Sequence, residues 1–285
     1  MRAGKLRSRV RSQAQVVVSL NTTEYFLLNA SPDLRNQILS TPSLAPAHSP
    51  RHTPIVGVLL TSADVDAVAG LLHLREFQPL HVYATQSVRR ILHEENRIFR
   101  VLERADPPVV WHDVPLNTWL PLGLQSSHAK EDPPARFRYV PLGSTYPDYV
   151  SAELRRILPS AEAVVGIAIE QGSRRFFCAP AIPGRSGEYK EWAQWSDLCL
   201  VEGTFWDDNE LISTGVGTKT AREIGHMPLS GAGGLLEELA SATRGRRILV
   251  HINNTNPILD EESNEYREVR DAGWEIAYDG MELEL

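Results

Sequence analysis

The first third of the chain places short β-rich runs beside segments of helical spacing. Two such runs at 15–20 and 24–30 are separated by three polar residues, which predicts a hairpin. Serine, proline and aspartate at 31–33 precede apolar residues three to four positions apart, which predicts a helix with Ser31 as its N-cap. The continuous apolar run at 55–60 is typical of a strand that is buried on both faces of a sheet.

The same alternation continues to the end of the chain. Further strands are predicted at 81–85, 109–114, 137–142, 163–170, 174–180, 197–203, 246–252 and 274–280. Helices are predicted within 61–77, at 86–103 and 151–158, after Ser230 and from Asp260. Strands interspersed with helices throughout, without a break in composition, predict an α/β or mixed α+β sandwich that forms one domain over residues 1–285.

Composition and charge narrow the classes of function. The chain has 285 residues and a formal net charge of −7, which argues against binding nucleic acid. No apolar run is long enough to cross a membrane. The only cysteines, Cys178 and Cys199, lie far apart in the sequence, which excludes a disulfide framework and favours the cytoplasm. Residues 1–13 carry five basic side chains and no acid, and we expect a solvated tail without a packed role.

Two candidate sites contain acidic residues that follow an apolar strand. Asp64 and Asp66 come directly after the run at 55–60, where a pair of carboxylates suits a hard metal ion. The alternative is that one of them caps the following helix. Glu202 ends the strand predicted at 197–203 and faces either solvent or a site, whereas the acids after it, including Glu210, indicate a solvated helix start.

Two further candidate sites contain histidine. His226 precedes the helix predicted after Ser230, and a helix N-terminus favours a neutral imidazole suited to metal binding or proton transfer. His251 ends a buried strand and is followed by three amides. These are Asn253, Asn254 and Asn256. The alternatives are a structural histidine at 226 and a purely structural asparagine-rich turn after His251.

Several long motifs together resemble one family of proteins. They are LVHINNTNPILDEES, YDGMELEL, LVEGTFWDDNEL, GVGTKTAREIGHMPLSGAGG and FLLNASPDLRNQI. The chain resembles the B protein of pyrroloquinoline quinone (PQQ) biosynthesis from about Gly4 to Leu285, and the match is weakest between Gln125 and Ala163. The resemblance implies the metallo-β-lactamase fold, a four-layered αββα sandwich.

The resemblance also implies a function. It indicates a cytoplasmic participant in making the redox cofactor PQQ, which hydroxylates the tyrosine of a small peptide-derived Glu–Tyr precursor with Fe(II) or transports PQQ or its precursor. It allows a homodimer. The alternative is a non-catalytic carrier or binding relative with a degraded metal site. A metal-dependent hydrolase is disfavoured because the histidine motif of the fold is incomplete here.

This chain departs from the family pattern at several positions. The family's first strand and the cysteine cluster that forms its structural zinc site have no counterpart in this sequence. Ala67 replaces the histidine of the family's Asp-His pair, and Glu202 replaces an aspartate. The resemblance therefore implies Asp66, His251 and Glu202 as metal ligands, His226 and Asp64 as catalytic groups, and the three asparagines as substrate contacts. With one ligand lost, we expect Fe(II) binding to be weak or absent.

Overall fold

The computed structural model describes residues 8–285 apart from positions 22, 47–48, 50–51, 76–77, 105, 124–132, 185–186 and 243. Two compact units divide the chain, and each is described by itself below. The first consists of Met1–Arg11 together with Gly166–Leu285, and the second consists of Ser12–Val165. The expectation of one domain over residues 1–285 stays a prediction.

The second unit contains a five-stranded sheet in the order β1-β2-β3-β4-β5. Its strands are β1 (Val16–Ser19), β2 (Tyr25–Leu28), β3 (Ile55–Leu59), β4 (His81–Ala84) and β5 (Val110–Asp113). The predicted hairpin is confirmed, because β1 and β2 pair antiparallel, and the other neighbours pair parallel. Two more strands of this unit, β6 (Leu120–Pro121) and β7 (Arg136–Gly143), pair antiparallel.

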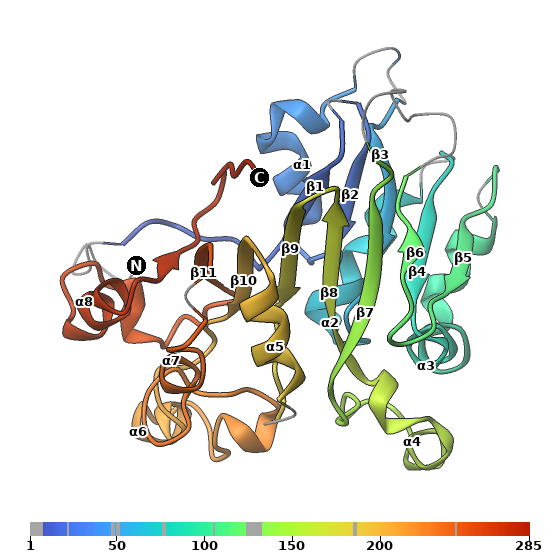
Figure 1. Cartoon of the computed structure of the whole chain (residues 1–285). Helices are drawn as coiled ribbons and strands as arrows, with labels where there is room; N and C mark the ends of the chain where they lie inside the picture. The colour runs from blue at the N-terminus through green and yellow to red at the C-terminus, as the bar shows by residue number, and fades with distance from the viewer. Residues whose placement is uncertain are drawn as a thin grey trace. The chain divides into compact units, whose positions relative to one another are not determined.

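The first unit contains most of the second sheet and forms the yellow-to-red part of the chain in Figure 1. Its strands lie in the order β12-β11-β10-β9-β8. They are β8 (Val164–Gln171), which begins in the second unit, β9 (Arg174–Ala179), β10 (Leu198–Glu202), β11 (Arg246–Val250) and β12 (Glu275–Ile276). The β8–β9 pair is antiparallel and the others are parallel, so both sheets are mixed, as expected.

Short helices connect the strands of both units. Those of the second unit are α1 (Leu34–Ser40), α2 (Val65–Val68), α3 (Gln86–Arg90) and α4 (Ala152–Ile157), with 3-10 helices at Pro42–Leu44, Ala69–Leu74, Arg97–Arg104 and Ser160–Glu162. Those of the first unit are α5 (Glu188–Trp195), α6 (Glu210–Ser213), α7 (Leu235–Glu238) and α8 (Asn264–Asp271), with 3-10 helices at Arg222–Ile224 and Pro257–Leu259.

The structure differs from the sequence prediction at several helices. The segment predicted as one helix at 86–103 divides into α3, a π-helical turn at Ile91–Glu95 and a 3-10 helix, because Asn96 leaves helical geometry between the last two. Helix α1 begins at Leu34 with Asp33 as its N-cap, while the Ser31 hydroxyl donates to Gln37 instead.

The N-terminal segment makes contacts that the sequence did not predict. Residues 1–7 lie outside the described residues. Arg11 donates from Nε to the carbonyl of Ala277 at 2.8 Å, and the guanidinium of Arg9 lies 4.4 Å from the ring centre of Tyr278. Partial burial lowers the pKa of Arg11. The expected tail without a packed role is therefore wrong for these two arginines, which pack on the C-terminal segment of their own unit.

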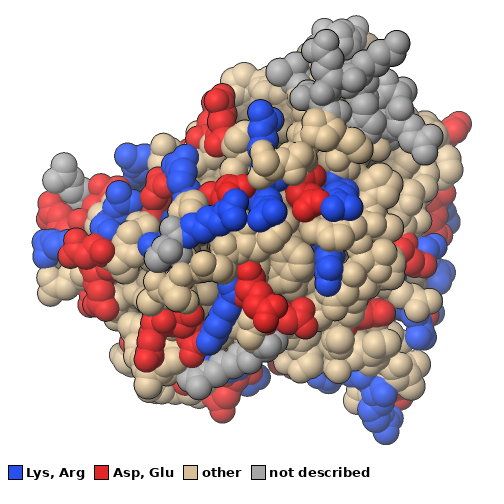
Figure 2. Space-filling model, viewed as in Figure 1, with Lys and Arg blue, Asp and Glu red and all other residues tan. Residues whose placement is uncertain are grey.

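The charged surface is mixed in sign. On the face drawn in Figure 2, Lys and Arg side chains are interspersed with Asp and Glu. Two ion pairs of the first unit, Arg246 with Glu275 at 2.9 Å and Arg244 with Asp197 at 3.0 Å, illustrate the pattern. Such alternation differs from the uniformly basic face with which nucleic-acid-binding proteins contact phosphates. No helix within the described residues is long and apolar enough to span a bilayer.

Candidate active site

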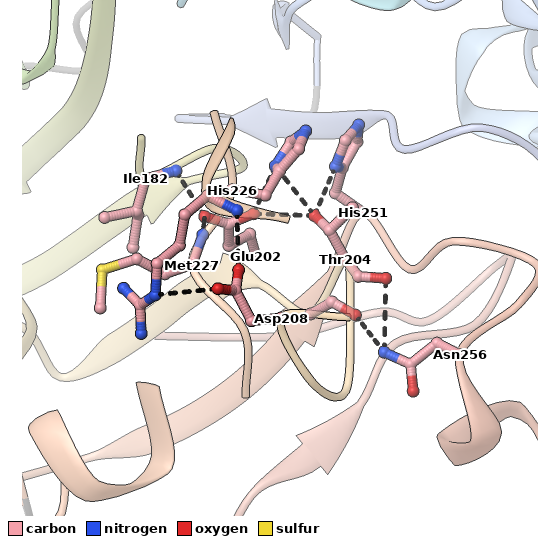
Figure 3. A network of polar contacts seen from close by, with 10 residues as sticks. Ile182, Glu202, Thr204, Asp208, His226, Met227, His251 and Asn256 are labelled. Carbon is pink, nitrogen blue, oxygen red and sulfur yellow. Dashed lines mark hydrogen bonds and ion pairs between the residues drawn. The ribbon is translucent and has the colours of Figure 1, made fainter. Parts of the chain in front are cut away.

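Two neighbouring parallel strands of the first unit end at the same level. The register of β10 and β11 pairs Glu202 with Val250, so the loop after β10 begins beside the loop after β11. In parallel sheets, ligands bind outside the carboxyl ends of the strands. Glu202 is the last residue of β10, Thr204 belongs to the first loop and His251 belongs to the second. A third segment brings His226 against them (Figure 3).

The carboxylate of Glu202 lies at the centre of the cluster. Its side chain is 0% exposed. The Oε1 atom accepts the backbone N–H of Ile182 at 2.6 Å and that of Met227 at 3.1 Å. The Oε2 atom accepts the Thr204 hydroxyl at 2.8 Å and lies 2.6 Å from Nδ1 of His226. Since an ionised carboxylate has about four lone-pair sites, these four donors occupy it fully.

The hydrogen bonds assign a proton to Nδ1 of both imidazoles. Because the single hydroxyl proton of Thr204 goes to Glu202, its oxygen accepts from His251 Nδ1, which lies at 3.0 Å. Nδ1 of His226 carries the proton that Glu202 accepts, and it also lies 3.2 Å from the Thr204 hydroxyl. Both rings are thus assigned Nδ1–H, and in the neutral form of each ring the lone pair is on Nε2.

The two rings lie side by side. Their centroids are 5.3 Å apart and their planes differ by 27°. Figure 3 shows both rings extending in the same direction from Thr204, with their outer nitrogens at the same end. Phe205 packs edge-on against His226, with 5.8 Å between ring centroids. Imidazoles that present Nε2 together can, in their neutral form, bind a divalent metal ion or accept a proton from a substrate.

Hydrogen bonds between the two loops hold this arrangement. Asn256, which is 2% exposed, donates from Nδ2 to the carbonyl of Gly203 at 2.8 Å and accepts the backbone N–H of Ile258 at 3.0 Å. The backbone N–H of Asn253 donates to the carbonyl of Thr204 at 3.1 Å. The loops pack so closely that a Cβ at position 203 would lie 3.0 Å from Cβ of Leu249, which explains the glycine there.

The asparagines after His251 differ in their surroundings. The side chain of Asn256 is buried and bonded within the fold, which matches the structural alternative. Asn253 is half-buried and donates from Nδ2 to the Thr255 hydroxyl at 2.6 Å. Asn254 is exposed. Substrate contacts from these three residues stay a prediction.

The position expected for His226 is wrong. It does not begin a helix, because α7 starts nine residues later at Leu235. The intervening backbone instead bonds to the loop after β10, with Leu229 N–H donating to the carbonyl of Phe205 at 2.9 Å and Ser230 N–H to that of Trp206 at 2.8 Å. The proton on Nδ1 of His226 is therefore assigned from the contact with Glu202 rather than from a helix dipole.

The other two acidic candidates, Asp64 and Asp66, belong to the second unit. Asp64 occupies the N-cap position of α2, but its side chain accepts no capping bond from the helix and instead accepts the Ser62 hydroxyl at 2.8 Å. Asp66 lies in the first turn of α2, and Ala67 is buried there. The roles that the resemblance gives Asp64 and Asp66 stay predictions.

The side chains present offer the type of ligand atom that suits a transition metal, but fewer ligands than such a site usually has. Imidazole nitrogens held by a carboxylate or hydroxyl behind them are the usual arrangement at such sites. Catalytic metal sites generally take three protein ligands, however. Within the described part of the chain, no three His, Cys, Asp or Glu side chains form a group that could hold a metal ion.

The sequence did not predict that one acidic residue of this region is buried. Glu210, expected at a solvated helix start, is 3% exposed. Its Oε2 accepts the backbone N–H of Trp206 at 2.6 Å, and its Oε1 accepts the Thr255 hydroxyl. Burial raises the pKa of Glu210. The sequence carried no signal for this, since the residue's partners lie in two different loops.

Comparisons with known proteins agree on one family. The model of the beta-lactamase superfamily domain matches residues 24–252. Coenzyme PQQ synthesis protein B of Methylobacterium nodulans is 41% identical over 285 residues, which cover 99% of this chain and 91% of that protein. The protein of the same name from Pseudomonas protegens is 36% identical over 286 residues, which cover 100% of this chain and 91% of that protein.

Solved structures give the same result for the fold. The crystal structure of Zn(2+)-bound PqqB from Methylobacterium extorquens matches with a TM-score of 0.87 and 37% identity, covering 98% of this chain and 89% of that one. A diphosphatase of the PhnP family matches with a TM-score of 0.60 and 17% identity, covering 96% and 84%, which shows the fold alone. The metallo-β-lactamase fold is thereby confirmed.

Proposed function

Because the chain belongs to the coenzyme PQQ synthesis protein B family, we propose that it hydroxylates the tyrosine ring of a small Glu–Tyr precursor of PQQ, using a bound Fe(II) ion. The observation that carries the proposal is the pair of imidazoles, His226 and His251, whose Nδ1 atoms are bonded to Glu202 and Thr204. Neutral imidazole is a ligand that suits non-haem iron.

The residues of the site have distinct roles in this proposal. His226 and His251 would hold the metal, and Fe(II), when bound, would supply the redox chemistry with O₂ and a two-electron reductant that ring hydroxylation requires. Glu202 does not bind the metal itself, because its oxygens already accept four hydrogen bonds. It fixes the ring of His226 and raises its basicity, as carboxylates behind metal-binding histidines do. Thr204 does the same for His251.

Two features support the setting of the reaction. The PqqB structure from Methylobacterium extorquens is described as Zn(2+)-bound, so a member of this family binds a divalent ion. Both cysteines, Cys178 and Cys199, are buried free thiols, and burial raises the pKa of both. Unpaired thiols suit the reducing cytoplasm, where we place the reaction.

A carrier of PQQ or its precursor is the second candidate. It is favoured by the observation that the described residues contain no group of three potential ligands. In a carrier, the same imidazoles bind an acidic precursor or a metal without turnover. The two candidates therefore differ in chemistry but share the site.

The test is anaerobic loading of the full chain with Fe(II), followed by addition of a Glu–Tyr peptide, a two-electron reductant such as ascorbate, and O₂, of which one oxygen atom enters the ring and the other is reduced to water. Hydroxylation adds one oxygen atom to the peptide per step, which mass spectrometry detects. His251→Asn should abolish the product, whereas His73→Asn, which changes an exposed histidine of the second unit, should not. Binding of the peptide without an oxygenated product would favour the carrier. Neither binding nor product would contradict both candidates.

A further inference from the structure

Glu210 is unusual because it is buried without taking part in the histidine cluster. Glu202 and Glu210 are the only acidic side chains among the described residues that are buried. Burying a carboxylate is unfavourable unless it is well hydrogen-bonded. Burial raises the pKa of Glu210, which reflects this cost. The contacts of this side chain show what its burial achieves.

The two oxygens of Glu210 contact two different loops. Oε2 accepts the backbone N–H of Trp206, two residues after Thr204, at 2.6 Å. Oε1 accepts the hydroxyl of Thr255, four residues after His251. The carboxylate therefore joins the loop after β10 to the loop after β11, and each of these loops carries one member of the histidine cluster.

The contacts close into a ring of hydrogen bonds. The Thr255 hydroxyl, which donates to Glu210, accepts from Nδ2 of Asn253 at 2.6 Å. The backbone N–H of Asn253 donates to the carbonyl of Thr204 at 3.1 Å. From Thr204 the chain leads back to Trp206 and so to Glu210. This ring includes residues of both loops. Loss of any one of its hydrogen bonds should therefore weaken the contact between the two loops.

The backbone at His251 needs such support. Its φ is 54°, in the left-handed region that residues other than glycine adopt only at an energetic cost. Such conformations persist only where the surroundings over-determine them. The turn at His251 sends its ring back toward Thr204, and the loop that follows is attached through Thr255.

We propose that Glu210 and Thr255 form a clasp between the two loops that positions His251 beside Thr204, so that its Nδ1 is protonated and its Nε2 is presented for binding. Both are positioning residues rather than catalytic ones. The inference deepens the proposed function and rests on it for the role of the metal. The position and tautomer of His251, however, can be tested without any metal.

The test compares matched variants of the full chain. Thr255→Val keeps the shape of the side chain but removes the hydroxyl, and Glu210→Ala removes the carboxylate. Thr255→Ser retains the hydroxyl. Glu210→Gln can still accept from Trp206 through its oxygen and donate to Thr255 through its amide, so it preserves the clasp without charge. Circular dichroism first establishes that each variant is folded.

Two readouts decide the outcome. Imidazole ¹⁵N NMR shifts report the tautomer of His251, and titration with Zn²⁺ alone reports the presentation of Nε2. In Thr255→Val and Glu210→Ala we expect mixed tautomers and Zn²⁺ affinity lowered about 10–100-fold, as when a supporting partner of a ligand is lost. Thr255→Ser and Glu210→Gln should resemble the original chain in both readouts.

The outcomes separate the clasp from the proposed function. Wild-type tautomer and affinity in folded Thr255→Val and Glu210→Ala would overturn the clasp. If the original chain binds no Zn²⁺, the metal-dependent function fails, and the tautomer of His251 alone decides the clasp. Should both variants unfold, Asn253→Ala interrupts the same ring at a half-buried side chain. It should shift the tautomer in the same direction, and an unchanged tautomer there would count against the clasp.

Discussion

Glu202 ends an apolar strand and Asp64 follows one, but their environments in the structure differ. Glu202 is fully buried and accepts hydrogen bonds from segments that lie 20 to 25 positions away in sequence. Asp64 is half-buried and accepts the hydroxyl of Ser62, two residues before it. The first acid is an internal support for a histidine, while the second keeps contact with solvent. Similar sequence settings therefore do not imply similar chemical roles.

The largest expected effect is on stability, from Glu202→Ala. Removing the carboxylate leaves two backbone N–H groups, the Thr204 hydroxyl and the His226 ring without their acceptor. Loss of one partner of a buried charged network costs about 3–5 kcal/mol. Urea unfolding should show this decrease in the free energy of unfolding, with a smaller one for Glu202→Gln. If Glu202→Ala lowered the free energy of unfolding by less than a surface substitution does, the four contacts would not contribute to stability.

The second effect concerns binding, from His251→Asn. Asparagine tolerates the left-handed backbone at this position and can still donate to Thr204, but it has no Nε2. We expect Zn²⁺ affinity to fall at least about 10–100-fold, since losing a ligand costs no less than losing its supporting partner. The free energy of unfolding should change little. Unchanged affinity would remove His251 from the binding site.

The same two regions show which features of the fold and of the site could be predicted from the sequence. The strands that end at Glu202 and directly before His251 were predicted, because continuous apolar runs are visible locally. That Glu202 and His226 belong to one site followed from the family resemblance and not from a local pattern, because their hydrogen bond joins residues 24 positions apart. The burial of Glu210 was missed for the same reason. Local patterns predict strands, whereas a site assembled from several loops depends on tertiary contacts.

A third prediction concerns pH. Burial raises the pKa of Glu210 in the folded state, so the folded chain binds this proton more tightly than the unfolded chain. Stability contributed by this group is therefore highest at acid pH and declines as pH rises from the unfolded pKa, about 4.3, through the folded value. Glu210→Gln should remove this part of the slope when unfolding free energies are measured across that window. An unchanged slope would mean that Glu210 titrates normally.

The smallest effect is expected in the loop of Asp64, from Ser62→Ala. The Ser62 hydroxyl donates to Asp64 Oδ2 at 2.8 Å and accepts the backbone N–H of Asp64 at 3.2 Å. These contacts are local, and alanine fits the space of serine. An ordinary hydrogen bond contributes about 0.5–1.5 kcal/mol net, so the free energy of unfolding should fall by about that amount. It should fall clearly less than for Glu202→Ala in the same urea titration. If the two variants lost equal stability, this loop would be as strongly coupled to the fold as the cluster around Glu202, and the contrast between the two acids would not hold.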